Sequence, residues 1–135
     1  MQRNMDLVRI ILMRIEDSPS GWAAHPFGIA GFTPEQVGYH AHIMMEDGLI
    51  EGVDVTHLGS KCPEAMPRSL TWKGHEFLDL ARDQKRWNQA KVAIGKVGSA
   101  PISVWIKVLQ ELMFKELNLA SGGLDRPGSQ TRGAE

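Results

Sequence analysis

The chain has 135 residues, a formal net charge of −1 and an apolar fraction of 42%, which together fit one domain with one core of ordinary size. No segment approaches the ~20 consecutive apolar residues of a membrane-spanning helix, and the single cysteine, Cys62, closes no disulfide within the chain. These features exclude a membrane-spanning protein and a disulfide framework. They predict a cytoplasmic protein without a targeting segment.

The charge is unevenly distributed along the chain. Residues 1–56 hold three basic and eight acidic side chains, residues 57–97 hold eight basic and four acidic ones, and residues 98–135 hold four of each. This distribution predicts a molecule with one acidic and one basic side. A partner could therefore bind to either side, according to its own charge.

The first predicted element is a helix over Met5–Glu16. Its apolar residues recur at helical spacing, at Val8, Ile11, Leu12 and Ile15. Arg9 and Arg14 interrupt the apolar run, and we expect both to point to solvent. Residues 22–32 follow no helical period and are predicted to be a loop with a short extended piece near 27–29.

The second predicted helix spans Thr33–Asp47 and has a clear start and stop. Thr33 is placed to cap the helix, Pro34 fits its first turn, and Gln36 completes a capping box. Gly48 directly follows, where a glycine allows the left-handed backbone that ends many helices.

A β-hairpin is predicted next, with strands at 49–55 and Arg68–Leu70 and a long polar tip at 56–67. Thr71 then caps a helix that we expect to run to about Lys96, with a possible bend near Arg82 and Asp83. After the break at residues 98–101, a last helix is predicted over 102–117. The low apolar content of 119–135 predicts a disordered tail behind a single domain of residues 1–118.

The fold class predicted from these elements is mostly α with a small β-hairpin. A helix ending in D-G-L-I, then a hairpin, then an L-T-x-x-G-x-x-x-L helix start resembles winged-helix proteins, here with added C-terminal helices. More narrowly, five segments resemble the domain-of-unknown-function 2513 family over about residues 4–118: Asn4–Arg9, Gln36–His40, Gly48–Gly52, Leu70–Asp79 and Trp87–Asn88. The resemblance implies a winged-helix-like fold and a phage or prophage context, and it implies no activity. The sequence departs from ordinary winged-helix proteins in placing a loop, not a helix, before Thr33.

Two function hypotheses follow, and the first is a DNA-binding regulatory protein. The helix Thr33–Asp47 carries no lysine or arginine, so phosphate contacts would have to come from the hairpin and the helix behind it. The candidate cations are Lys61, Arg68, Lys73, Arg82, Lys85 and Arg86, and Gln36 and His40 are the candidates for base edges. The alternative interpretation of these cations is an ordinary solvated surface with local ion pairs.

The second hypothesis is a protein-interaction module, such as a phage factor that contacts a host protein. The acidic face that carries Glu35, His42 and Glu46 would then bind a basic protein. Apolar residues of the last helix also predict a homodimer, with the interface at Trp105, Val108, Leu109, Leu112 and Met113.

Neither a catalytic nor a metal site is predicted. His40 and His42 stand two residues apart on a helix and so point in different directions. His75 lacks a second histidine four residues later, and the chain contains no glycine-rich phosphate loop. We therefore expect no enzyme activity and no cofactor.

Overall fold

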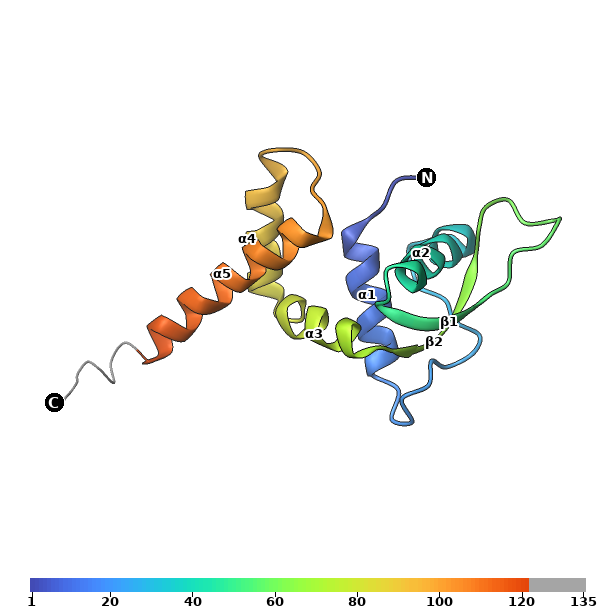
Figure 1. The fold of residues 1–135 in the computed structure, drawn as a ribbon, viewed down its shortest axis with the longest axis horizontal. Helices are drawn as coiled ribbons and strands as arrows, with labels where there is room; N and C mark the ends of the chain where they lie inside the picture. Colours follow the sequence, from blue (N-terminus) through green and yellow to red (C-terminus); the bar gives the residue numbers. More distant parts are fainter. Residues whose placement is uncertain (122–135) are drawn as a thin grey trace, which may run out of the picture. The chain divides into compact units, whose positions relative to one another are not determined.

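The computed structural model describes residues 1–121 (Figure 1). Its elements are α1 (Met5–Glu16), α2 (Pro34–Glu46), β1 (Ile50–Asp54), β2 (Ala65–Leu70), α3 (Trp72–Ala81), α4 (Gln84–Gly95) and α5 (Ile102–Ser121). The expected class, mostly helical with a small hairpin, is confirmed. None of the described helices is both long and apolar enough to cross a membrane.

The chain forms two compact units, Met1–Arg82 and a second unit that begins at Asp83. From the sequence, a single domain of residues 1–118 is predicted in place of these two units. Helix α5 continues to Ser121, so the first residues of the predicted tail are helical. The remainder of that tail, 122–135, lies outside the described residues.

In the first unit, α1 packs against α2, α3 and β2, and in Figure 1 it lies between α2 and α3. The apolar stripe seen in the sequence explains this position, because α1 buries side chains toward several neighbours at once. Leu7, Val8, Ile11, Leu12 and Ile15 of α1 are all buried. The core is completed from the other elements by Val37, Ala41, Met44, Ile50, Phe77 and Leu78.

Both ends of α2 follow the local signals in the sequence. The Thr33 hydroxyl accepts from Gln36 N at 3.1 Å, and the Gln36 side chain accepts from Thr33 N at 2.9 Å, which is the expected capping box. After the helix, Gly48 takes a φ of 79°, as its position predicted. These contacts fix where α2 begins and where the chain turns into β1.

Strands β1 and β2 form an antiparallel two-stranded sheet with an irregularity between Glu51 and Gly52. β2 begins at Ala65, three residues earlier than predicted from the sequence. The hydrogen bond from Val55 N to Glu64 O, at 3.0 Å, extends the hairpin contacts into the polar stretch that was predicted to be the loop tip. Pairing with β1 therefore overrides the weak strand preference of this polar segment.

The single helix expected over residues 71–96 is instead two helices, α3 and α4, and this prediction was wrong. Asp83 caps α4, its side chain accepting from Arg86 N at 2.8 Å. Arg9 reaches the end of α3 from α1 and donates from Nε to Ala81 O at 2.6 Å and from Nη2 to Arg82 O at 2.7 Å. Because the guanidinium binds carbonyls that a continuous helix would have used itself, the chain ends one helix and starts another.

The same contacts correct a second expectation, because Arg9 is buried and does not point to solvent. Arg14 is exposed as expected, and it donates to Gly28 O at 2.7 Å.

In the second unit, α4 and α5 form a helical hairpin. The indole rings of Trp87 and Trp105 stack with centroids 4.7 Å apart and an interplanar angle of 24°. Ala90 and Ile94 of α4 and Leu109 of α5 are buried with them. In the first turn of α4, next to Trp87, Arg86 makes two hydrogen bonds to the Glu116 carboxylate, at 2.9 and 2.7 Å.

Candidate functional site

An apolar groove lies on the solvent side of the β1–β2 hairpin. Val53 and Met66 are direct cross-strand partners, and each side chain is 43% exposed. The groove has a volume of about 330 Å³ and is lined by Trp22, Ala23, His25, Val53, Met66 and Arg68. On a solvent-facing strand surface polar residues are the rule, so an apolar pair at this place calls for a functional explanation.

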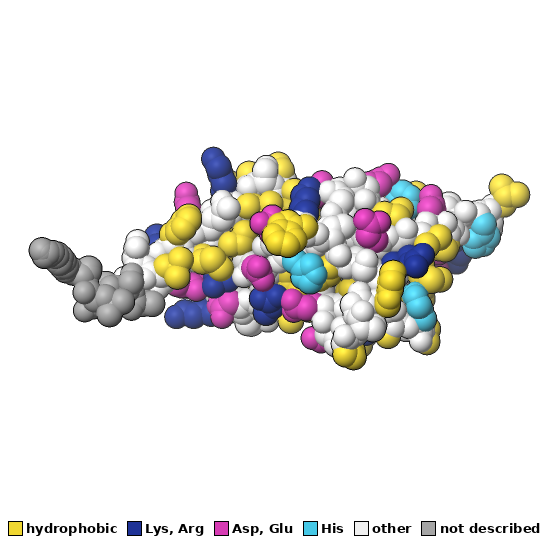
Figure 2. Space-filling model, turned by 60° about the horizontal axis from the view of Figure 1, so that its bottom comes forward, with side chains coloured by type: hydrophobic (Ala, Val, Ile, Leu, Met, Phe, Trp, Pro, Cys, Tyr) yellow, Lys and Arg dark blue, Asp and Glu magenta, His cyan; other side chains and the backbone are white. Residues whose placement is uncertain are grey.

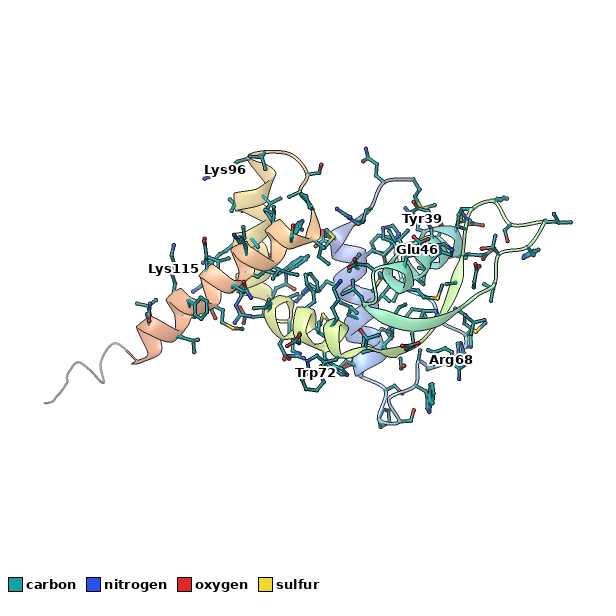
Figure 3. All side chains as sticks on the ribbon, viewed as in Figure 1. Tyr39, Glu46, Arg68, Trp72, Lys96 and Lys115 are labelled. Carbon is teal, nitrogen blue, oxygen red and sulfur yellow. The ribbon has the colours of Figure 1, made fainter. Side chains whose placement is uncertain are left out.

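Trp22 and Arg68 close one side of this groove. The guanidinium carbon of Arg68 lies 5.0 Å from the ring centroid of Trp22, within the range of a cation–π contact. The backbone N–H of Ala23 donates to Arg68 O at 2.7 Å, which fastens the loop after α1 to β2 and holds the indole ring beside the strand. Figure 3 labels Arg68 at β2. The Trp22 ring is nevertheless 56% exposed, so much of it stays available to another molecule.

Arg68 is a predicted site residue, whereas the groove itself was not predicted from the sequence. The signal available in the sequence was the alternation along β2, which places Met66 and Arg68 on the same face of the strand. The expected strand began only at Arg68, so Met66 was assigned to a flexible tip. The contribution of Trp22 could not be read from the sequence, since it depends on a loop crossing to β2.

Two of the candidate cations for DNA binding in the first unit, Lys73 and Arg82, are paired with acidic side chains. Lys73 donates to Asp47 O at 2.9 Å and to Asp47 Oδ2 at 3.1 Å, so it neutralises the C-terminal end of α2. Arg82 pairs with Glu16 and with Asp79. The hydrogen bonds that Arg82 donates to Glu16 are the main reason why the pKa of Arg82 is raised.

Two further candidate cations belong to the second unit. Arg86 is buried, and its hydrogen bonds to Glu116 are the main cause of its raised pKa, so it serves the α4–α5 hairpin and does not face a partner. Lys85 is exposed on α4, and Lys61 is exposed in the hairpin loop. On the face drawn in Figure 2, Lys and Arg side chains are interspersed with Asp and Glu. Arg82 and Arg86 are thus each used in ion pairs within their own unit, and the role of the candidate cations in DNA binding stays a prediction.

The two candidates for reading base edges are occupied within the fold. Gln36 uses its side-chain oxygen in the capping box. His40 is buried, accepts from Asn4 N through Nε2 at 2.8 Å, and has Nδ1 at 2.8 Å from Gln36 O. Burial lowers the pKa of His40, with a partly opposing contribution from the Gln36 carbonyl. His40 thus belongs to the core, contrary to the sequence-based expectation.

The acidic face proposed for a basic partner is spread along α2. Glu35 and Glu46 are eleven residues apart, which corresponds to about 16 Å along a helix. His42 Nδ1 lies 3.9 Å from Glu46 Oε2 and is buried without a hydrogen-bond partner. His42 Nε2, on the other side of the ring, lies 3.7 Å from Asp54 Oδ2. Hydrogen bonds from Thr56 are the main cause of a lowered pKa at Asp54. Figure 3 labels Glu46 and Tyr39 on α2.

The predicted homodimer interface divides into two groups. Trp105 and Leu109 are buried, Trp105 against the Trp87 ring, so these two residues form the core of the α4–α5 hairpin and not an outer interface. Val108, Leu112 and Met113 are half-buried. Within residues 1–121, no group of three or more histidine, cysteine, aspartate or glutamate side chains is arranged to hold a metal ion.

The fold defines the chain as a small, mostly helical protein with one β-hairpin in its described part. The chain belongs to the DUF2513 family of hypothetical proteins, whose model matches residues 2–100. It is 40% identical over 95 residues to an uncharacterised protein of Haemophilus influenzae, covering 70% of this chain and 79% of the relative. No solved structure matches the chain. The phage or prophage context implied by the sequence resemblance stays a prediction.

Proposed function

We propose that this protein is a protein-binding module that uses the groove on its hairpin. The observation that carries the proposal is the Trp22–Arg68 stack beside the solvent-facing Val53–Met66 pair. Tryptophan, methionine and arginine are the residue types enriched at protein interfaces. Tryptophan and arginine also dominate the few positions that contribute most of the binding free energy.

The charges of the first unit favour a protein partner over duplex DNA. Residues 1–82 hold seven basic and eleven acidic side chains, a net charge of −4. Helix α2, which would take the place of a DNA-reading helix in a winged-helix protein, contributes no cation. Three basic residues of this unit are already engaged by the fold: Arg9 with carbonyls of residues 81 and 82, Lys73 with Asp47, and Arg82 with Glu16. Affinity for a phosphate backbone needs several uncompensated cations on one surface.

The chemistry of the groove specifies the partner. The exposed part of the Trp22 ring and the Val53–Met66 pair offer area for one large apolar side chain. Arg68 offers guanidinium N–H groups that suit a carboxylate. The expected partner is therefore a protein segment that carries a large apolar residue next to an aspartate or glutamate.

The test is selection of peptides from a random display library on the full chain, followed by affinity measurements by fluorescence anisotropy. We expect enriched peptides to combine an apolar and an acidic residue, and Trp22→Ala to weaken their binding by about tenfold or more. Trp72→Ala is the matched control, because Trp72 is also an exposed tryptophan but lies on α3, away from the groove lining. Equal effects of the two substitutions, or no enrichment over random peptides, would overturn the proposal.

DNA binding is the other outcome that this experiment has to separate. A gel-shift series with random duplex DNA is run at rising salt concentration. Each phosphate contact steepens the fall of the logarithm of the binding constant with the logarithm of the salt concentration by about 0.9. We expect no binding near physiological salt. Binding that weakens, and whose salt slope falls, in a Lys61→Ala, Arg68→Ala double variant would assign the hairpin to nucleic acid and reject the protein-binding proposal.

A further inference from the structure

Helix α5 carries two apolar faces, and the hairpin with α4 uses only one of them. The face toward α4 holds Trp105, which stacks on Trp87, Leu109, which is fully buried, and Glu116, which binds Arg86. This assigns Trp105, Leu109 and Glu116 to one side of the helix, as their spacing of four and seven residues requires.

The second face is a row that we call the α5 seam, made of Ile106, Gln110, Met113 and Leu117. Its spacing of four, three and four residues is the pattern with which one helix packs along another in a coiled coil. Leu117 is 54% exposed, and Phe114, which flanks the seam, is 63% exposed. Ile106 and Met113 are half-buried, being next to the α4-facing side.

None of the charged residues of α5 belongs to the seam. At 100° per residue, Glu111 and Lys115 lie about 100° or more around the helix from every residue of the seam, and both are exposed. Lys107 flanks the seam on the side of Phe114, and Glu116 binds Arg86 of α4. Figure 3 labels Lys115 on the outside of α5. The seam itself holds three apolar residues and one neutral amide.

We propose that the α5 seam binds the seam of a second copy of this chain, in register and in parallel. An uncharged seam is suited to its own copy, because identical surfaces meet without like-charge repulsion. Gln110 is suited to its own copy as well, since an amide both donates and accepts hydrogen bonds and two such side chains satisfy each other across a two-fold axis. A polar residue at one position of an apolar seam is a known means of fixing register.

The pairing also explains why α5 carries apolar side chains on a second side. In the α4–α5 hairpin, α5 has one neighbouring helix, whereas in the dimer it packs against α4 and against α5 of the second copy. The proposal is independent of the hairpin groove, which belongs to the first unit.

Sedimentation velocity of the full chain, from low to high micromolar concentration, tests the association. We expect a monomer–dimer equilibrium whose Kd rises about tenfold or more in Leu117→Glu and in Met113→Gln, the second being a milder change in case the first perturbs the helix. Val92→Glu is the matched control, because Val92 is exposed on α4 outside the seam. Circular dichroism establishes that each variant keeps its helix content.

The register is tested by oxidation of Gln110→Cys in a Cys62→Ser background, with Lys115→Cys as the control on the outer side of α5. We expect a disulfide-linked dimer for position 110 and not for position 115, because a disulfide needs Cα atoms within about 7 Å. A wild-type chain that stays monomeric at high micromolar concentration would overturn the proposal. So would a dimer that is indifferent to the seam substitutions, or one that links equally well through position 115.

Discussion

The backbone N–H of Asn4 donates to Nε2 of His40 at 2.8 Å, and this bond ties the start of α1 to the middle of α2. Nδ1 of the same ring lies 2.8 Å from Gln36 O, a carbonyl that only accepts, so the geometry assigns the proton to Nδ1 and leaves Nε2 unprotonated. A second proton on Nε2 would remove the acceptor that Asn4 uses.

This arrangement predicts that acid destabilises the fold. Burial holds the pKa of His40 below its ordinary value of 6.5 in the folded state. Stability is therefore complete above about pH 6.5 and is lost as the pH falls from there through the lower folded-state pKa, because the unfolded chain binds the proton first. The free energy of unfolding, measured by urea titration between pH 5 and pH 8, should decrease toward acid.

His40→Gln should weaken that pH dependence and cost about 1–3 kcal/mol at pH 8, where the lost hydrogen bonds dominate. His75→Gln is the control, because His75 is exposed on α3. An unchanged pH profile in His40→Gln would contradict the assignment of the acid response to this ring.

Gly74 is predicted to tolerate no side chain. A Cβ at this position would lie 2.1 Å from Leu49 O, far inside van der Waals contact with a backbone atom. We expect Gly74→Ala to lower the free energy of unfolding by about 3 kcal/mol, at the upper end of overpacking costs. Gly95→Ala at the end of α4 is the control, since nothing lies within 4 Å of a Cβ there. Chemical denaturation of both variants decides the point.

At Gly48 the constraint is the backbone conformation, and a side chain would have free space. Its φ of 79° lies in the left-handed region, while a Cβ would meet nothing within 4 Å. Gly48→Val should destabilise the protein by about 1–2 kcal/mol, because a β-branched residue resists this conformation. Gly48→Asn should cost less, as asparagine enters this region more readily. If valine and asparagine had the same effect in thermal unfolding, the backbone argument would fail.

Arg9 is predicted to hold the end of α3. Arg9→Met keeps most of the apolar stem but removes the donors to Ala81 O and Arg82 O, which should cost about 1–3 kcal/mol. Hydrogen exchange should accelerate at the last turn of α3. Arg14→Met is the comparison, because Arg14 donates to Gly28 O at an exposed site and should matter less. Equal stabilities of the two variants would show that the buried contact contributes nothing.

The stacked pair in the second unit provides the last prediction. Trp105→Ala should destabilise the α4–α5 hairpin by about 3–5 kcal/mol, the usual cost of emptying a buried tryptophan site. Because the two compact units have separate cores, hydrogen exchange should increase across α4 and α5 and change little in α1. Loss of protection throughout the chain would instead mean that the two units unfold as one.

Several features of this protein were determined by the sequence alone, because they depend on neighbours within a few residues. The Thr33 cap with Gln36, the Thr71 cap of α3 and the left-handed Gly48 are local hydrogen-bond or backbone effects. The order of helices and hairpin follows from such signals together with apolar periodicity. Among the residues that line the groove, only Arg68 was predicted from the sequence to be a site residue.

The tertiary structure decided what depends on contacts between distant residues. Arg9 was expected in solvent because its own helix gives no hint of a partner, and its acceptors lie more than seventy residues away. Those acceptors also explain why one expected helix is two. His40 was expected at the surface for the same reason, since its partner Asn4 is thirty-six residues distant. The Trp22–Arg68 stack exists only because the loop after α1 bonds to β2 through Ala23. Side chains whose polar groups are satisfied by remote backbone atoms leave no period in the sequence, so only the folded chain shows where they lie.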